Sequence, residues 1–384
     1  MSQLDLYYAT NRCHLGKDRW NPTAYGKKFS DDGMENLRFG RVSLQLDDAR
    51  VLKCFQTPVG QLGSGDGLSL MDYLSKQVPH GSIQAYQEAL QSNIHQDSQN
   101  AALGSAALFQ DIQQAMLQSS DVLVFIHGFN VSWQDAVANA AALQLMLNRP
   151  GLGDPKQKVL VLLFTWPSDG QALPFTSYRS DRAEAEGSGA AFGRGLLKLR
   201  DFLAGLRDRS GQGQALCGQN IHLLCHSMGN YLLQHTLRRI DDFTPGNALP
   251  RLFEQVFLCA PDVDDTALED PAKLGRLHEL ARQVTVYHNK GDKALVISDY
   301  TKGNPDRLGS AGAARPVALH QKIQQLDCSL VVHGLTKHGL SEHSYYLIGD
   351  INLDLRHSMD GLSPADPQRR RQRHPLYANV WLFS

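Results

Sequence analysis

Apolar runs of strand length alternate with stretches of helical period through the middle of the chain, from about residue 121 to residue 295. Nearly continuous runs of Val, Leu, Ile and Phe are typical of strands covered on both faces. The runs predicted to be such strands are "DVLVFIHG" (121–128), "KVLVLLFTW" (158–166), "NIHLLCHS" (220–227), "EQVFLCAPD" (254–262) and "QVTVYHN" (283–289). A later run, "DCSLVVHG" (327–334), is predicted to be the last strand.

Helical patterns separate these runs. An alanine-rich segment over 132–151 stops at Pro150-Gly151, and further helices are predicted over 182–209 and 230–240. Alternation of strand and helix predicts a mostly parallel, doubly wound sheet with flanking helices. The chain is therefore expected to have an α/β fold.

Two regions outside this alternation are less regular. The runs "LDLYYAT" (4–10) and "RFGRVSLQL" (38–46) are expected to form an antiparallel N-terminal edge of the same sheet. Residues 54–120 are polar, rich in glutamine and partly helical, and are interpreted as an insertion near the active-site entrance. Residues 1–384 are predicted to be a single domain.

The composition indicates a globular protein and argues against several kinds of partner and site. Hydrophobic residues make up 42% and charged residues 20% of the 384 positions, which is globular, and the net charge of -1 gives no global case for nucleic acid as a partner. The six cysteines form no C-x-x-C pair, which argues against a cysteine zinc site and a disulfide framework. The N-terminus lacks a signal-peptide pattern, and no apolar run approaches the roughly 18 residues of a membrane span.

From these features we expect a cytoplasmic protein with no metal, no cofactor and no stable membrane insertion. The oligomeric state stays open. A basic run near the C-terminus, "RRRQRH" (369–374), is interpreted as a solvated tail segment, with a functional basic patch as the alternative.

The stretch "IHLLCHSMGNYLL" (221–233) combines a buried strand, a turn bearing Ser227 and the start of a helix. Serine hydrolases carry their nucleophile on such a turn, usually in the pattern G-x-S-x-G. Gly229 fits the pattern, whereas Cys225 replaces the first glycine. The N–H of Met228, at the helix N-terminus, is a candidate oxyanion donor. The alternative is an ordinary strand-to-helix turn in which the serine caps the helix.

A second motif, "VFIHGFN" (124–130), ends an earlier strand. In this fold the corresponding loop faces the nucleophile and supplies the second oxyanion-hole N–H. Gly128 would let the backbone turn and leave the Phe129 amide available, while His127 would brace the loop. A purely structural loop glycine is the alternative.

In hydrolases of this fold, the acidic residue and then the histidine of the triad follow the nucleophile along the chain. Asp292 in "VYHNKGDKAL" follows the second strand after Ser227 and is the predicted acid. Asp262 in "CAPDVDD" is the second candidate, although it and Asp264 suit helix capping or the wall of the site.

Three histidines follow the last predicted strand. His343 in "LSEHSYYLIGD" is the predicted base, and His338 remains an alternative, whereas His333 at the strand end suits a structural role. His226, beside Ser227 in sequence, is expected to point away from it and pack near the following helix.

Together these motifs resemble a bacterial α/β-hydrolase family of unknown function whose members are described as predicted serine esterases or lipases. The residues that carry the resemblance are "YATNR", "FIHGFN", "FTWPSDG", "YRSDRAEAEGS", "CHSMGN", "APDVD", "VYHNKGDKAL" and "EHSYY", in this order. The resemblance runs from about Tyr7 to Tyr346 and is weakest over residues 54–120. It implies the α/β-hydrolase fold and a triad of Ser227, Asp292 and His343.

The resemblance also points to three residues near the site. Trp166 would either line the substrate pocket or be buried, and Tyr178 and Asp181 are expected to form a structural hydrogen bond. The predicted function is a carboxylesterase that cleaves small to medium acyl esters through a Ser-His-Asp triad and an acyl-enzyme. A lipase, thioesterase or amidase would use the same triad, and a non-catalytic binding or scaffold protein is the alternative from another class.

Overall fold

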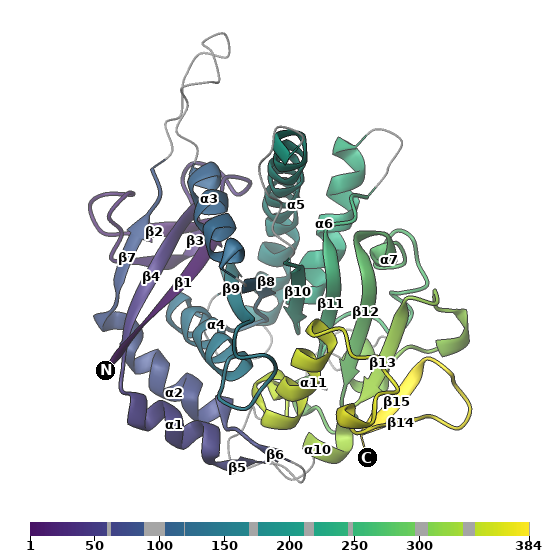
Figure 1. Ribbon diagram of the computed structural model, residues 1–384. Helices are drawn as coiled ribbons and strands as arrows, with labels where there is room; N and C mark the ends of the chain where they lie inside the picture. Colours follow the sequence, from purple (N-terminus) through teal and green to yellow (C-terminus); the bar gives the residue numbers. More distant parts are fainter. Residues whose placement is uncertain are drawn as a thin grey trace.

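A mostly parallel sheet of eleven strands forms the centre of the described protein. The computed structural model describes residues 1–59, 63–87, 104–118, 120–168, 176–210, 219–244, 249–295, 306–332 and 342–383 (Figure 1). Its strands are β1 (Ser2–Thr10), β4 (Arg38–Leu46), β7 (Ser82–Ala85), β8 (Ser120–Ile126), β9 (Lys158–Thr165), β10 (Ile221–His226), β11 (Phe253–Cys259), β12 (Ala281–His288), β13 (Ile323–Asp327), β14 (Arg371–Arg373) and β15 (Val380–Phe383).

The strand order is β14-β15-β13-β12-β11-β10-β8-β9-β1-β4-β7. Neighbours from β9 to β13 pair in parallel, as does β15 with β13. At the other side β1 is parallel to β9 but antiparallel to β4, and β4 is antiparallel to β7. The doubly wound sheet and its antiparallel N-terminal edge are therefore confirmed. A hairpin of β2 (Arg12–Leu15) and β3 (Ala24–Phe29) follows β1.

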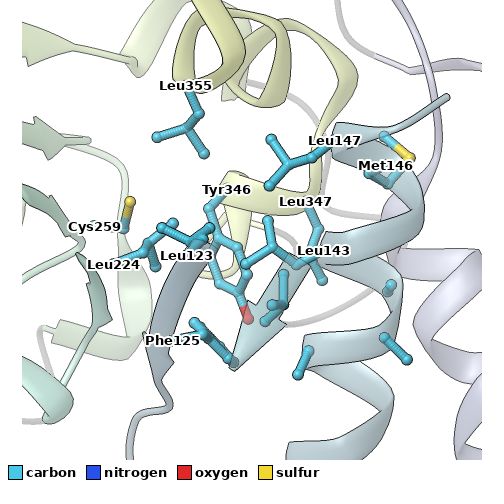
Figure 2. Close-up of a cluster of buried hydrophobic side chains, with 14 of the residues drawn as sticks. Leu123, Phe125, Leu143, Met146, Leu147, Leu224, Cys259, Tyr346, Leu347 and Leu355 are labelled. Carbon is cyan, nitrogen blue, oxygen red and sulfur yellow. The ribbon is translucent and has the colours of Figure 1, made fainter. Parts of the chain in front are cut away.

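Helices cover both faces of the sheet (Figure 1). One layer contains α1 (Asp48–Gln56), α2 (Gly67–Gln77), α4 (Trp133–Leu147) and α11 (Gly349–Met359), and the other contains α3 (Gly104–Leu117), α5 (Thr176–Ser210) and α6 (Gly229–Phe243). Because side chains alternate along a strand, Leu123 and Phe125 of β8 pack on the α4 side while Val122 and Val124 pack on the α5 side. Figure 2 shows the α4-side cluster, in which Leu123, Leu143 and Tyr346 lie together.

Residues 54–120 contribute elements to these same layers. Their described parts include α2, which packs on α4, the edge strand β7, and α3, which packs on β4 and β8. Their position near the active-site entrance stays a prediction.

The last predicted strand, over 327–334, is wrong for residues 328–332, and residues 333–334 lie outside the described ranges. The strand β13 ends at Asp327, and Ser329–Val332 forms the short helix α10. The Asp327 carboxylate accepts the N–H of Ser329 (2.9 Å) and its hydroxyl, which satisfies the first donors of that turn. The capping pair therefore outweighs the strand propensity of the apolar residues after it.

The C-terminal basic run is not a solvated tail at its first and third positions. The side chains of Arg369 and Arg371 are buried, and both bind the carboxylate of Asp354 on α11, at 3.2 Å and 2.7 Å from their Nε atoms. The Tyr287 hydroxyl also donates to Asp354 (2.7 Å). Burial favours the neutral acid, but the two arginines lower the pKa of Asp354 to about 2.

Candidate active site

Ser227 lies on the turn between β10 and α6 with a φ of 52° and is 4% exposed. Asn130 and Ala260, which follow β8 and β11 at the same edge of the sheet, also have positive φ. These are three of the four such non-glycine residues in the described ranges. Left-handed backbone at non-glycine residues is strained and gathers at functional sites, and a strained strand-to-helix turn is typical of a nucleophile elbow.

Two glycines permit this turn. A Cβ added to Gly229 would lie 2.8 Å from the carbonyl oxygens of Ile126 and His127, and one on Gly128 would lie 2.6 Å from the Cβ of Ser227. Cys225 is fully buried within the cluster on the α5–α6 side. The departure from glycine at this position is therefore accommodated by packing.

The loop after β8 is held from α5. Asp181 accepts the Asn130 N–H (3.0 Å) and the hydroxyl of Ser168, and the same hydroxyl accepts the Val131 N–H (3.0 Å). The N–H groups of Phe129 and Met228 donate to no other group in the described part of the chain. Both predicted oxyanion donors are therefore available beside Ser227.

His127 braces this loop in a neutral form. The Trp166 N–H donates to its Nε2 (3.3 Å), so its Nδ1 carries the proton and donates to the Gly128 carbonyl (2.9 Å). Burial, with Arg12 adding to it, lowers the pKa of His127 to about 3. The Trp166 indole is fully buried, donates to the His127 carbonyl (3.1 Å) and stacks on the imidazole. The structure thus places Trp166 in the interior.

The predicted acid and base are in contact. The Nδ1 atom of His343 lies 2.8 Å from Oδ2 of Asp292, whose other oxygen accepts the N–H groups of Ala294 and Leu295. Burial of the ring opposes its charged form, but the Asp292 carboxylate outweighs burial and raises the pKa of His343 above its usual 6.5.

Asp262, the second candidate acid, has different partners. It accepts the Tyr178 hydroxyl (2.8 Å) and lies 3.5 Å from the Arg307 Nε. The predicted pairing of Tyr178 with Asp181 is therefore wrong, because Asp181 is used by the loop after β8. His333 and His338 lie outside the described residues.

His226 links the serine turn to His343. Its Nε2 lies 3.1 Å from the His343 carbonyl oxygen, and its ring lies 4.7 Å from the His343 ring and 4.8 Å from that of Tyr346. The sequence interpretation, which placed this side chain near the following helix, did not predict its contact with His343. Within the ranges that the structure describes, no hydrogen bond joins the Ser227 hydroxyl to the His343 ring.

Asn289 was missed by the sequence interpretation. Its side-chain oxygen accepts the Gly291 N–H (3.0 Å) in the Asp292 turn, and its amide donates to the Glu342 carbonyl (3.0 Å) beside His343. One buried side chain thus ties the two loops that bring Asp292 and His343 together. The only signal in the sequence is an asparagine after a strand, which also suits an ordinary turn.

Residues 105–347 match the family model described as "Alpha/beta hydrolase of unknown function (DUF900)". The chain belongs to this α/β-hydrolase family. The matched range does not include the N-terminal edge, so the resemblance over residues 7–104 stays a prediction.

Two individual proteins are also similar. "Uncharacterized protein alr1448" of Nostoc sp. is 24% identical in an alignment 222 residues long. The match covers 46% of this chain and about half (53%) of that protein. Phospholipase PlaB from Legionella pneumophila, solved in complex with thio-NAD, is 16% identical over 54% of this chain and 37% of its own. The TM-score of this match is 0.22.

Two kinds of feature are absent from the described residues. None of their helices has the length and apolar character needed to cross a bilayer. No three His, Cys, Asp or Glu side chains among them come together in a way that could hold a metal ion.

Proposed function

We propose that this member of the α/β-hydrolase family is a serine carboxylesterase in which Ser227, His343 and Asp292 form the triad. The observation that carries the proposal is the Asp292–His343 pair, which packs against His226 directly before a serine with a φ of 52°. The available N–H groups of Phe129 and Met228 support an oxyanion hole at the same place.

In the first half of the reaction, His343 Nε2 takes the proton of Ser227 as its Oγ bonds to the ester carbonyl carbon. The carbonyl electron pair moves to the oxygen, which accepts hydrogen bonds from Phe129 and Met228. Collapse breaks the bond to the alcohol oxygen, which leaves with the proton from His343. In apo structures the serine–histidine bond is often long and tightens when substrate binds, which fits the geometry described above.

The second half repeats these steps with water. His343 takes a proton from water as its oxygen attacks the acyl carbon, and collapse returns that proton to Ser227 as the carboxylic acid leaves. Asp292 holds the ring with Nδ1 protonated and stabilises the imidazolium in both halves. The same residues could cleave a thioester or an amide, so substrate panels with one acyl group and different leaving atoms are needed to rank them.

The proposal is tested with a fluorophosphonate probe and p-nitrophenyl butyrate. We expect labelling at Ser227, mapped by peptide mass spectrometry, and a loss of turnover of about 10³-fold or more in Ser227→Ala. Ser180→Ala, an exposed serine on α5, serves as the control and is expected to behave as wild type.

An unlabelled wild-type protein without turnover would favour a binding or scaffold role for the fold. Wild-type activity in Ser227→Ala would instead show that another residue is the nucleophile. A series of acyl esters of increasing chain length then separates an esterase from a lipase.

A further inference from the structure

Among the described residues, Arg182 on α5 forms no direct ion pair with a carboxylate, although the Asp262 carboxylate stabilises its charge from a greater distance and helps to raise its pKa. In the described part of the chain no Asp or Glu lies within ion-pair distance of it. Its NH1 donates to the Tyr178 hydroxyl (3.2 Å), and its guanidinium carbon lies 3.5 Å from the centre of the Tyr231 ring. By contrast, Arg307 nearby is held by Asp264 at 2.8 Å and Asp262 at 3.5 Å.

The position of this cation is set by groups of the candidate active site. Tyr178, which accepts from Arg182, donates to Asp262, whose own N–H donates to the carbonyl of Ser227 (3.2 Å). The Tyr178 ring also meets the Phe129 ring edge-on at 5.7 Å. Short contacts therefore connect Arg182 with both the serine turn and the predicted oxyanion donor.

Most hydrogen-bonding capacity of the guanidinium is unused by the protein. An arginine has five N–H donors, and none of its nitrogens is among the buried, unpartnered atoms of the described residues. The other donors are therefore at least partly accessible to solvent. Stacking on Tyr231 fixes the plane of the group, which leaves its edge available for a planar or tetrahedral anion.

We propose that Arg182 binds an anionic group of the ester substrate, a carboxylate or a phosphate, beside the reacting carbonyl. The unused N–H donors of a partly buried, oriented guanidinium can bind an anionic ligand through charge-assisted hydrogen bonds. The inference rests on the proposed esterase function and adds a substrate class to it.

Two matched substrate pairs test the subsite and separate the two anions. The carboxylate pair is p-nitrophenyl hemiglutarate and its neutral methyl ester; the phosphate pair is 1-butyrylglycerol 3-phosphate and 1-butyrylglycerol. In Arg182→Gln we expect kcat/KM for the anionic member of at least one pair to fall by about tenfold or more. The neutral member should change by less than about twofold, and Arg182→Lys should retain part of the preference.

Arg179→Gln is the matched control, because Arg179 is an exposed arginine on the same helix and should leave both pairs unchanged. Equal loss on the charged and neutral members would overturn the proposal in favour of a helix-packing role, as would no change on either. Binding of glutarate and glycerol 3-phosphate to Ser227→Ala, measured by calorimetry with and without Arg182→Gln, tests the subsite even where turnover is absent. Failure of fluorophosphonate labelling in wild type concerns the esterase proposal alone.

Discussion

Two effects act on the pKa of His343 in opposite directions. Burial lowers it, and the Asp292 carboxylate raises it by a larger amount. Because a general base must be neutral, kcat/KM for an ester should rise with pH through an inflection above 6.5. In Asp292→Asn we expect the inflection to move to lower pH and kcat to fall by about 10³-fold or more. A pH–rate profile of each protein measures both effects.

The contribution of the same pair to the stability of the fold falls as pH rises, whereas the activity is expected to increase. A pKa raised in the folded state stabilises the protein below about pH 6.5, and this contribution is lost as pH rises through the raised value. A gain of activity with pH therefore cannot come from better folding at this site. Asp262→Asn is the comparison: if it abolished activity while Asp292→Asn kept it, Asp292 would not be the acid.

At the scale of elements, the β2–β3 hairpin that follows β1 supports the oxyanion loop through Arg12. Its buried guanidinium donates to the carbonyls of Val131 (2.8 Å) and Ser168 (3.2 Å) and to the hydroxyl of Thr165 (2.9 Å). We expect Arg12→Met to lower the free energy of unfolding by about 3 kcal/mol, because these buried acceptors lose a charged donor. Urea unfolding measures the loss.

Turnover should fall in Arg12→Met as well, since the loop that carries Phe129 would lose its support. Arg41→Met on β4, where the side chain is about one-third exposed, is the control and should cost little. Wild-type turnover in a destabilised Arg12→Met would contradict a role for the β2–β3 hairpin at the site.

The sequence predicted elements well where local pattern decides the outcome. Apolar runs covered on both faces identified β8 to β12, and β4 was predicted with its observed bounds. The pattern failed at 328–332, where a capping pair competes with an apolar run. At the site, motif order along the chain predicted the contact of Asp292 with His343, but the partner of Tyr178 depends on packing between residues 84 positions apart.

For the whole molecule, the cluster around Asp354 fastens the C-terminal strands to α11 and the sheet. The pKa of Asp354 is about 2, below its unfolded value near 3.8, so the cluster stabilises the protein above pH 4 and less as pH falls towards 2. Asp354→Asn should cost about 3–5 kcal/mol at pH 7, because two buried arginines lose their partner. Urea unfolding at pH 7 and pH 3 should show a smaller difference at the lower pH.

Asp201→Asn is a suitable reference, because Asp201 is exposed and pairs only at the surface with Arg200. A difference between Asp354→Asn and wild type that did not shrink at low pH would contradict the assignment. The basic run therefore belongs to the stability of the fold, which composition alone could not reveal because the partner lies on another element.

The thiols of Cys225, Cys259 and Cys328 are fully buried, and burial raises the pKa of each well above its usual range. A thiol that is neither accessible nor ionised reacts slowly with an alkylating reagent. Cys225 lies on β10, two residues before Ser227, so its alkylation requires β10 to open. The rate at which iodoacetamide modifies Cys225 would then report the rate of local opening at the serine turn. This measurement needs no substrate and no engineered residue.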